Sequence, residues 1–390
     1  MSNYKKNLQA LLIGFGMVFF IFALVESFFQ LNQRFNWLER IQPEREFAAD
    51  TYDRNGLQFP NLMNLKPYPE ALDLNEPSDY SQIFDFPECH GERMDQNPFW
   101  MGVANCHARV TLRKMKSKRV VYDLNYNFDA HARRQIPSAQ PDSQNFLLFL
   151  GCSYTWGEGV AEEQAFTNLV TEKMGRPNAY NLGMGAYAPN YLLRVLEHGK
   201  NDLRLNDIHG KSGIAVYTYI DDQLRRALGG LSWVRHSVLA NAPYYFLDQG
   251  QLVSKGTFAS DRSWTTNFYQ WLAKSAILSF FGFEIPPHFS TSELELFAAM
   301  IGQIKNKVEQ EYGVRQFIFS AYPEKSNYIN ELRPLLEKRG IVVLDFTGFP
   351  LEKLSQGRSL IFGDGHPSPL GHEVYSQLML HEFQKNKIAF

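Results

Sequence analysis

Four polar segments of this sequence carry the residue types that acyl transfer needs. Residues 151–157, "GCSYTWG", supply a serine, and residues 181–190, "NLGMGAYAPN", supply glycine-rich backbone. Asp221-Asp222 supplies carboxylates, and residues 363–372, "GDGHPSPLGH", supply an Asp-x-His pair. A serine is a weak nucleophile alone, so it needs a base within hydrogen-bond reach and a group that orients the base. The intermediate also needs hydrogen-bond donors for its oxyanion.

The surrounding pattern predicts how these segments are positioned. Short apolar runs typical of buried strands lie at 146–150, 179–183, 213–220, 315–322 and 341–346. Amphipathic helical patterns separate them, at 162–175, 190–199, 292–312, 330–340 and 368–383. This alternation predicts an α/β fold, with a doubly wound, flavodoxin-like parallel sheet of about five strands and helices on both faces. Three of the polar segments follow strands and the fourth precedes the last helix, so we expect them to converge.

The combined motifs resemble the SGNH/GDSL hydrolase superfamily, and most closely its membrane-anchored bacterial members. The resemblance covers about residues 145–385, and "GCSYTWG" stands where the family has Gly-Asp-Ser-x-Thr-x-Gly. It implies Ser153 as the nucleophile, His366 as the general base and Asp364 as the carboxylate that orients the base. It implies no metal and no other cofactor. His372 is expected to pack within the last helix rather than act as the base.

Three positions depart from the family pattern. The aspartate before the nucleophile is Cys152 here, at a position that mostly supports the turn. Besides the backbone N–H of Ser153, the oxyanion hole is expected to use that of Gly185 or of Ala186, which occupies the family's glycine position. The third block places Asp221 where the family has an asparagine donor. An ionised carboxylate only accepts hydrogen bonds, so it would repel an oxyanion unless it were protonated or paired with one of the two arginines that follow.

The resemblance implies a serine esterase that acts on ester-linked acyl groups, either O-acetyl groups of glycans or lipid esters. Two alternatives remain open: an O-acyltransferase, and a catalytically decayed protein that binds a glycan or serves as a scaffold. The glycine spacing of residues 151–159 fits neither a P-loop nor a dinucleotide-binding motif. With 39 basic and 41 acidic residues, the chain also lacks the general basic footprint of a nucleic-acid-binding protein.

The first thirty residues are expected to be a membrane anchor. Residues 8–25 carry no charge. As a helix they would span about 27 Å, close to the roughly 30 Å hydrocarbon thickness of a bilayer. Lysines precede the run and no small-x-small cleavage site follows it, which favours an uncleaved signal anchor with its N-terminus in the cytoplasm. The main domain is then expected to be extracytoplasmic, in the periplasm or at the cell surface.

The rest of the chain divides into three expected parts. Residues 31–144 should form a linker and a small, loop-rich β region, and residues 145–390 the hydrolase-like domain. An aromatic insertion at about 231–289 should serve as a lid, as plain packing or as a membrane-facing surface. Cys89 and Cys106 are each followed by a histidine. They are interpreted as a disulfide, as free thiols or as part of a metal site.

Overall fold

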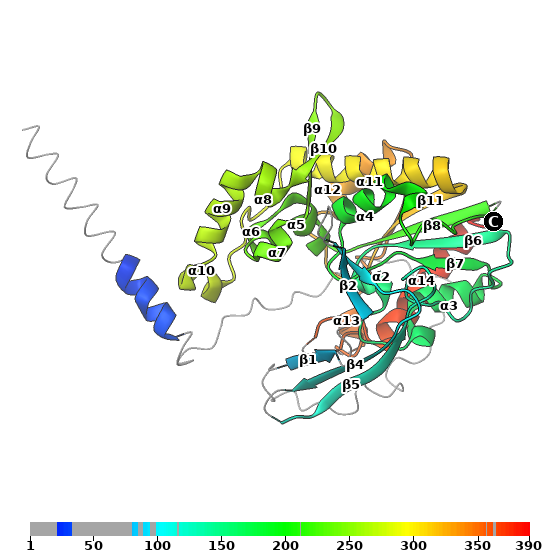
Figure 1. Cartoon of the computed structure of the whole chain (residues 1–390), viewed down its shortest axis with the longest axis horizontal. Helices are drawn as coiled ribbons and strands as arrows, with labels where there is room; N and C mark the ends of the chain where they lie inside the picture. The colour runs from blue at the N-terminus through cyan, green and yellow to red at the C-terminus, as the bar shows by residue number, and fades with distance from the viewer. Residues whose placement is uncertain are drawn as a thin grey trace, which may run out of the picture.

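The protein is described from a computed structural model, which describes residues 22–32, 80–84, 89–93, 99–114, 117–210, 212–355, 357–361 and 364–390. A five-stranded parallel sheet lies toward the right in Figure 1. Its strand order, β12-β11-β8-β6-β7, is flavodoxin-like and confirms the predicted sheet. The strands are β6 (Asn145–Leu150), β7 (Asn178–Asn181), β8 (Ser212–Tyr219), β11 (Val314–Ala321) and β12 (Val342–Asp345).

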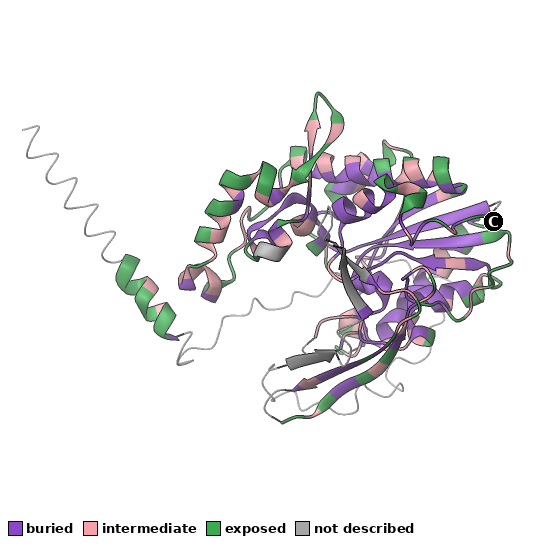
Figure 2. Cartoon of the chain, in the orientation of Figure 1, coloured by how far each residue is buried: buried purple, intermediate pink, exposed green. Residues whose placement is uncertain are grey.

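Helices cover both faces of this sheet, as expected. On one side, α11 (Thr291–Tyr312) packs between α4 (Pro189–Glu197) and α12 (Ile329–Glu337). On the other, α14 (Pro369–Lys385) packs against α3 (Phe166–Lys173). Leu148 of β6 belongs to the first core and Phe149 to the second. Every residue of the strand after the exposed Asn145 is apolar and buried, as Figure 2 shows for the strand as a whole.

The strands before residue 145 pair antiparallel and form a separate β region. One sheet contains β1 (Tyr80–Phe84), β4 (His107–Lys114) and β5 (Val120–Asn127), and β2 (His90–Arg93) pairs with β3 (Phe99–Gly102). Cys89 and Cys106 form a disulfide with their Cα atoms 5.6 Å apart. Of the three interpretations of these cysteines, the disulfide is confirmed. No group of three or more metal-ligating side chains occurs within the described ranges.

Residues 231–289 leave the sheet and fold into a peripheral subdomain of short elements. These are α6 (Leu231–Val234), α7 (Ser237–Ala240), the hairpin β9 (Pro243–Asp248) and β10 (Gln251–Thr257), α8 (Phe258–Asp261), α9 (Ser263–Leu272) and α10 (Ala276–Phe281). α8, α9 and α10 lie at the end of the molecule opposite β7 (Figure 1).

Most of the apolar run at residues 8–25 lies outside the described residues. The structure describes a helix over residues 22–32, which contains the last four residues of the run. Within the described part of the chain, no helix is long and apolar enough to cross a bilayer.

Candidate active site

The turn after β6 holds the predicted nucleophile. Ser153 begins α2 (Ser153–Trp156), a short helix whose four residues are all buried. Gly151 has φ +150°, and a Cβ there would collide with Thr155 Oγ1 and lie 3.0 Å from the carbonyl oxygen of Thr218. Thr155 Oγ1 donates to the carbonyl oxygen of Leu150 at 3.2 Å. Only glycine fits this close turn, which fixes the serine at the carboxyl end of the strand.

Of the three residues expected to be catalytic, His366 lies within hydrogen-bond distance of both others. Nε2 of His366 is 2.9 Å from Ser153 Oγ, and Nδ1 of His366 is 2.8 Å from Asp364 Oδ2. The Asp-x-His segment is folded back on itself, because Gly365 takes φ +85° and Ile361 N–H donates to the carbonyl oxygen of His366 at 2.8 Å. The turn lets two residues separated by one position contact each other through their side chains. An imidazole held between a hydroxyl and a carboxylate can accept the proton of the hydroxyl.

A second carboxylate, that of Glu158, also contacts the imidazole. Its Oε2 lies 3.4 Å from His366 Nε2, the same nitrogen that contacts Ser153. Burial opposes the charged imidazolium, but Glu158 and Asp364 outweigh it, so the pKa of His366 is raised above its usual value. Ser153 itself is only 3% exposed.

Gly185 and Ala186 lie in the turn after β7, beside Glu158. A Cβ built on Gly185 would be 3.7 Å from Glu158 Oε2. Ala186 has φ +64°, the left-handed conformation that favours the glycine found at this position in the family pattern. Asn181 joins this turn to α2, because its Oδ1 accepts from Gly183 N–H at 2.9 Å and its Nδ2 donates to the carbonyl oxygen of Thr155 at 3.1 Å.

Asp221 lies at the carboxyl end of β8, immediately before α5 (Asp222–Leu228), with its carboxylate engaged by neighbours. Oδ1 accepts hydrogen bonds from Tyr219 OH at 2.8 Å and from Ser326 Oγ at 2.5 Å, and Oδ2 accepts from Asn327 N–H at 2.7 Å. Burial raises the pKa of Asp221, and these donors partly offset that effect. Among the described contacts, no hydrogen bond joins Asp221 to Ser153 or to His366. Of the two arginines that follow, Arg226 pairs with Asp222 at 2.5 Å and Arg225 with Glu284 at 3.7 Å. The charge of Arg225 nevertheless lowers the pKa of Asp221 in part.

Two further residues singled out in the sequence have packing roles. Cys152 is buried in the turn itself, as the residue before α2, and belongs to the hydrophobic core that contains Phe149. His372 is buried in α14, where its Nδ1 accepts from Phe166 N–H at 3.2 Å and its ring stacks on that of Phe166. Burial lowers the pKa of His372 to about 3, so the ring is neutral at physiological pH. The expectation that His372 packs within the last helix is confirmed.

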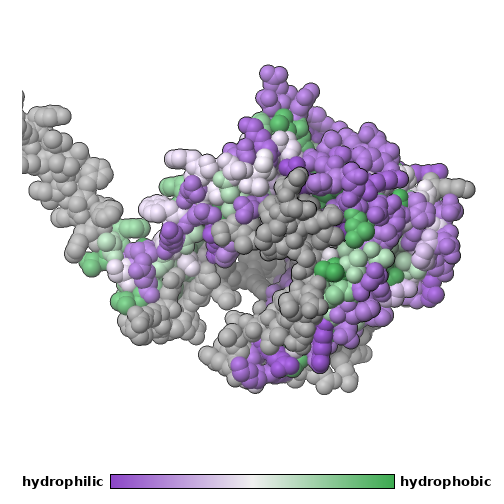
Figure 3. Space-filling view, in the orientation of Figure 1, coloured by the Kyte–Doolittle hydropathy of each residue, from purple (hydrophilic) through white to green (hydrophobic). Residues whose placement is uncertain are grey.

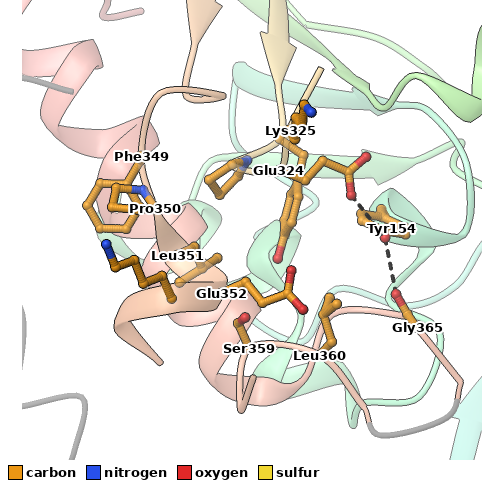
Figure 4. A pocket seen from close by; sticks show the side chains of 13 residues that line it. Tyr154, Glu324, Lys325, Phe349, Pro350, Leu351, Glu352, Ser359, Leu360 and Gly365 are labelled. Atoms are coloured by element: carbon orange, nitrogen blue, oxygen red, sulfur yellow. Dashed lines mark hydrogen bonds between the residues drawn. The ribbon is translucent and has the colours of Figure 1, made fainter. Parts of the chain in front are cut away.

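A pocket of about 240 Å³ is lined in part by Tyr154, Glu324 and Gly365 (Figure 4). Neither Ser153 nor His366 lines it, but their chain neighbours Tyr154 and Gly365 do. Tyr154 OH lies 3.1 Å from the carbonyl oxygen of Gly365 and 3.4 Å from Glu324 Oε2. Burial, followed by the charges of Asp221 and Asp222, raises the pKa of Glu324 to about 8. Glu324 is therefore mostly protonated at neutral pH, and the pocket wall carries less negative charge than its sequence indicates.

Comparison with known proteins gives likenesses of overall structure. No protein-family model matches the sequence, and no similar sequence was found among curated proteins. Solved structures that resemble the chain include a member of the lipolytic G-D-S-L family from Veillonella parvula, at 11% identity and a TM-score of 0.35. That match covers 62% of this chain and 99% of the other. An acetylxylan esterase from Geobacillus stearothermophilus matches at 13% identity and a TM-score of 0.36, over 62% of this chain and 94% of the esterase. At these values the likeness carries no argument about activity.

The β region supplies a buried support that sequence reasoning missed. The guanidinium of Arg134 donates to the carbonyl oxygens of Trp156 at 3.1 Å, of Gly157, and of Val160 at 2.5 Å. It also stacks over the ring of Tyr126 in β5, with its carbon 4.0 Å from the ring centroid. The hydroxyl of Tyr126 accepts from Gly159 N–H at 2.7 Å. Residues before the sheet therefore hold the loop that carries Glu158.

Glu158 and Glu324 were missed as well. Glu158 follows Ser153 by five positions and comes directly after the "GCSYTWG" motif, so its acidic side chain in a glycine-rich turn was an available signal. Glu324 follows β11 by three residues, and side chains just beyond strand ends lie near the ligand edge of such sheets. Arg134 had no signal, because nothing near it resembles a motif.

Proposed function

We propose that this chain is a serine esterase that acts on ester-linked acyl groups. The observation that carries the proposal is the arrangement of Ser153, His366 and Asp364, with 2.9 Å and 2.8 Å between successive polar atoms. This is the order of nucleophile, base and orienting carboxylate that acyl transfer requires. The resemblance of the "GCSYTWG" and "GDGHPSPLGH" motifs to SGNH/GDSL hydrolases supports the same function.

In the proposed reaction, His366 Nε2 accepts the proton of Ser153 as Oγ attacks the acyl carbonyl carbon. Asp364 keeps the imidazole oriented and stabilises its charged form. The backbone N–H of Ser153 and one from the Gly185–Ala186 turn donate to the oxyanion. Collapse of the intermediate breaks the bond to the alcohol, which leaves with the proton from His366. Water then attacks the acyl-serine while His366 Nε2 accepts its proton. His366 returns this proton to Ser153 Oγ as the acyl–Oγ bond breaks and the free acid departs.

The carboxylates around the site favour an uncharged acyl ester. Asp364 and Glu158 both lie within 3.4 Å of the imidazole nitrogens, so an anionic acyl group would be repelled. Acetyl esters of glycans satisfy this condition, and lipid esters are the second choice. Because the apolar run at residues 8–25 follows two lysines, we also propose that the chain is anchored in a membrane through its N-terminus and that the domain acts outside the cytoplasm.

Substitution of Ser153 tests the proposal directly. Ser153→Ala should lower kcat on a short-chain aryl ester by on the order of 10³-fold or more. Ser254→Ala is the matched control, because Ser254 lies exposed on β10, outside the site, and should retain full activity. Equal rates for Ser153→Ala and the parent chain would refute the assignment. Product analysis with an added alcohol acceptor distinguishes hydrolysis from acyl transfer.

The geometry of Asp221 favours a second candidate, a decayed glycan-binding or scaffold protein. Its carboxylate accepts from Tyr219, Ser326 and Asn327, whereas an oxyanion hole needs donors. A serine-reactive fluorophosphonate probe separates the two functions. Labelling that disappears in Ser153→Ala supports the esterase. Absent labelling together with tight glycan binding supports the scaffold.

A further inference from the structure

Large hydrophobic side chains that are exposed gather on three neighbouring helices. Among the described residues, they lie on helix 22–32, on α9 and at the end of α10, with Val120 and Val342 as the exceptions. On α9, Trp264 is 79% exposed, Phe268 43% and Trp271 64%. Their rings stack in a row, with centroids 5.8 Å and 6.0 Å apart. Phe281 and Phe283 extend the exposed surface past α10. A contiguous apolar surface of this kind marks an interaction site rather than ordinary solvent exposure.

Helix 22–32 is attached to α10 by its only acidic residue. Glu26 accepts a hydrogen bond from Ser275 Oγ at 2.8 Å, and also from the backbone N–H groups of Ala276 and, at 3.4 Å, Ile277. A carboxylate at this position accepts hydrogen bonds from N–H groups that have no partner within α10. Its negative charge is also attracted to the positive, N-terminal end of the helix dipole. Phe29 adds an apolar contact, since its ring lies 4.7 Å from that of Phe280. The chain is therefore attached to the peripheral subdomain at Glu26, the first residue after the apolar run.

This attachment places α9 beside the point where the apolar run ends. Trp271 precedes Ser275 by four residues, and Ser275 contacts Glu26 directly. Figure 1 shows α9, α10 and helix 22–32 grouped at one end of the molecule, and Figure 3 shows hydrophobic atoms on the visible face of helix 22–32. If residues 8–25 cross a bilayer, the headgroup layer lies at the level of Glu26 and hence near α9.

We propose that the aromatic face of α9, with Phe281 and Phe283, inserts into the headgroup region of the same bilayer. The proposal rests on the membrane anchor proposed above and adds a second contact with the lipid. Trp and Phe beside a lysine are the side chains that favour the membrane–water interface. Lys274 is exposed between α9 and α10, where its stem can cover apolar surface while its charge reaches lipid phosphates. The covalent continuity with the apolar run favours lipid over a protein as the occupant.

Quenching of tryptophan emission by brominated lipid tests this contact. The full chain is reconstituted into liposomes of phosphatidylcholine and phosphatidylglycerol, with or without acyl-brominated phosphatidylcholine. The emission of the parent chain minus that of a Trp264→Phe/Trp271→Phe variant is the difference emission, and it comes from those two side chains. We expect bromolipid to quench this difference emission by at least half. Trp233→Phe is the matched control, because Trp233 is a buried residue of α6 and its emission should not respond to bromolipid.

Every other outcome overturns the proposal. Difference emission that is unaffected by bromolipid means that α9 does not contact lipid. Trp264 and Trp271 could instead be shielded from acrylamide in a way that depends on protein concentration, without bromolipid quenching. That result means that a second copy or another protein covers the surface. A chain that does not float with liposomes refutes the anchor as well. Failure of the esterase proposal is recognised separately, because Ser153→Ala should keep the quenching whether or not the parent chain hydrolyses esters.

The Glu26 contact gives an independent check with the same probe. Glu26→Ala removes the acceptor for Ser275 and Ala276 while residues 8–25 stay unchanged. The variant should remain bound to liposomes but show weaker bromolipid quenching of Trp264 and Trp271. Undiminished quenching in this variant would overturn the part of the proposal in which the Glu26 contact holds α9 at the membrane.

Discussion

The carboxylate of Glu158 lies 3.4 Å from Nε2 of His366, the nitrogen that also contacts the hydroxyl of Ser153. The candidate base therefore has a carboxylate on each side of its ring, because Asp364 contacts Nδ1. In the proposed reaction, Asp364 orients the imidazole, and Nε2 must lose its proton before it can accept one from serine. Because Glu158 helps to raise the pKa of His366, it raises the pH at which this base would become available.

Replacement of Glu158 should shift the pH dependence of the reaction. Because Glu158 helps to raise the pKa of His366, the neutral base forms at higher pH than for an ordinary histidine. Glu158→Gln keeps the shape of the side chain and removes its charge, so the acidic limb of the kcat/KM profile should move to lower pH. Activity at pH 6 should rise relative to the alkaline plateau. Glu172→Gln, at an exposed position on α3, should leave the limb in place. An unmoved limb in Glu158→Gln would exclude this electrostatic role.

Replacement of Arg134 should weaken both stability and turnover. Arg134→Lys leaves a single ammonium where a planar guanidinium serves three carbonyl oxygens, so at least one buried acceptor loses its donor. We expect a loss of about 2 kcal/mol or more in the free energy of unfolding, with a fall in kcat as the Glu158 loop loosens. Chemical denaturation and aryl ester kinetics measure the two effects.

The matched control for Arg134→Lys is Arg109→Lys. Arg109 pairs with Asp123 on the exposed face of the β4–β5 sheet, where an ion pair contributes about 0.5 kcal/mol. Similar stabilities for the two variants would mean that the Arg134 contacts are not a strong support.

The backbone at Ala186 gives a stability test that leaves the chemistry intact. A side chain in the left-handed conformation costs about 1–2 kcal/mol, against about 0.5–1 kcal/mol for the extra freedom that glycine has in the unfolded chain. Ala186→Gly should therefore raise the free energy of unfolding by about 0.5 kcal/mol and keep the activity. Ala186→Val should lower stability, because a β-branched side chain tolerates φ +64° poorly. Thermal unfolding of both variants checks the sign, and a destabilised glycine variant would contradict the strain.

The sheet and the convergence of its polar segments could be predicted because they depend on local pattern. The apolar run ending at Leu150 and the alternation of strands with helices indicate a parallel sheet, and the ends of its strands meet by topology. The role of Asp221 could not be predicted in the same way. Its position at a strand end is local, but Ser326 lies 105 residues further along the chain and directs the carboxylate.

The N-terminal β region was the least predictable part. Its contribution depends on Arg134 and Tyr126, whose partners lie 22 to 33 residues away in a loop with its own motif. Every residue has a backbone carbonyl oxygen, so the residue types of the loop do not indicate which of its carbonyl groups accept hydrogen bonds from a guanidinium. The contacts of Arg134 with the loop could therefore be found only in the folded chain.

The same contacts bear on how this protein can diversify. A recombination event that exchanged the chain after residue 144 would separate Arg134 and Tyr126 from the loop at residues 156–160. The carbonyl oxygens served by Arg134 and the N–H of Gly159 would then lose these partners, unless the new β region carried the same two side chains. The β region and the sheet that follows it are therefore expected to be inherited together, with their shared border tolerating few crossovers.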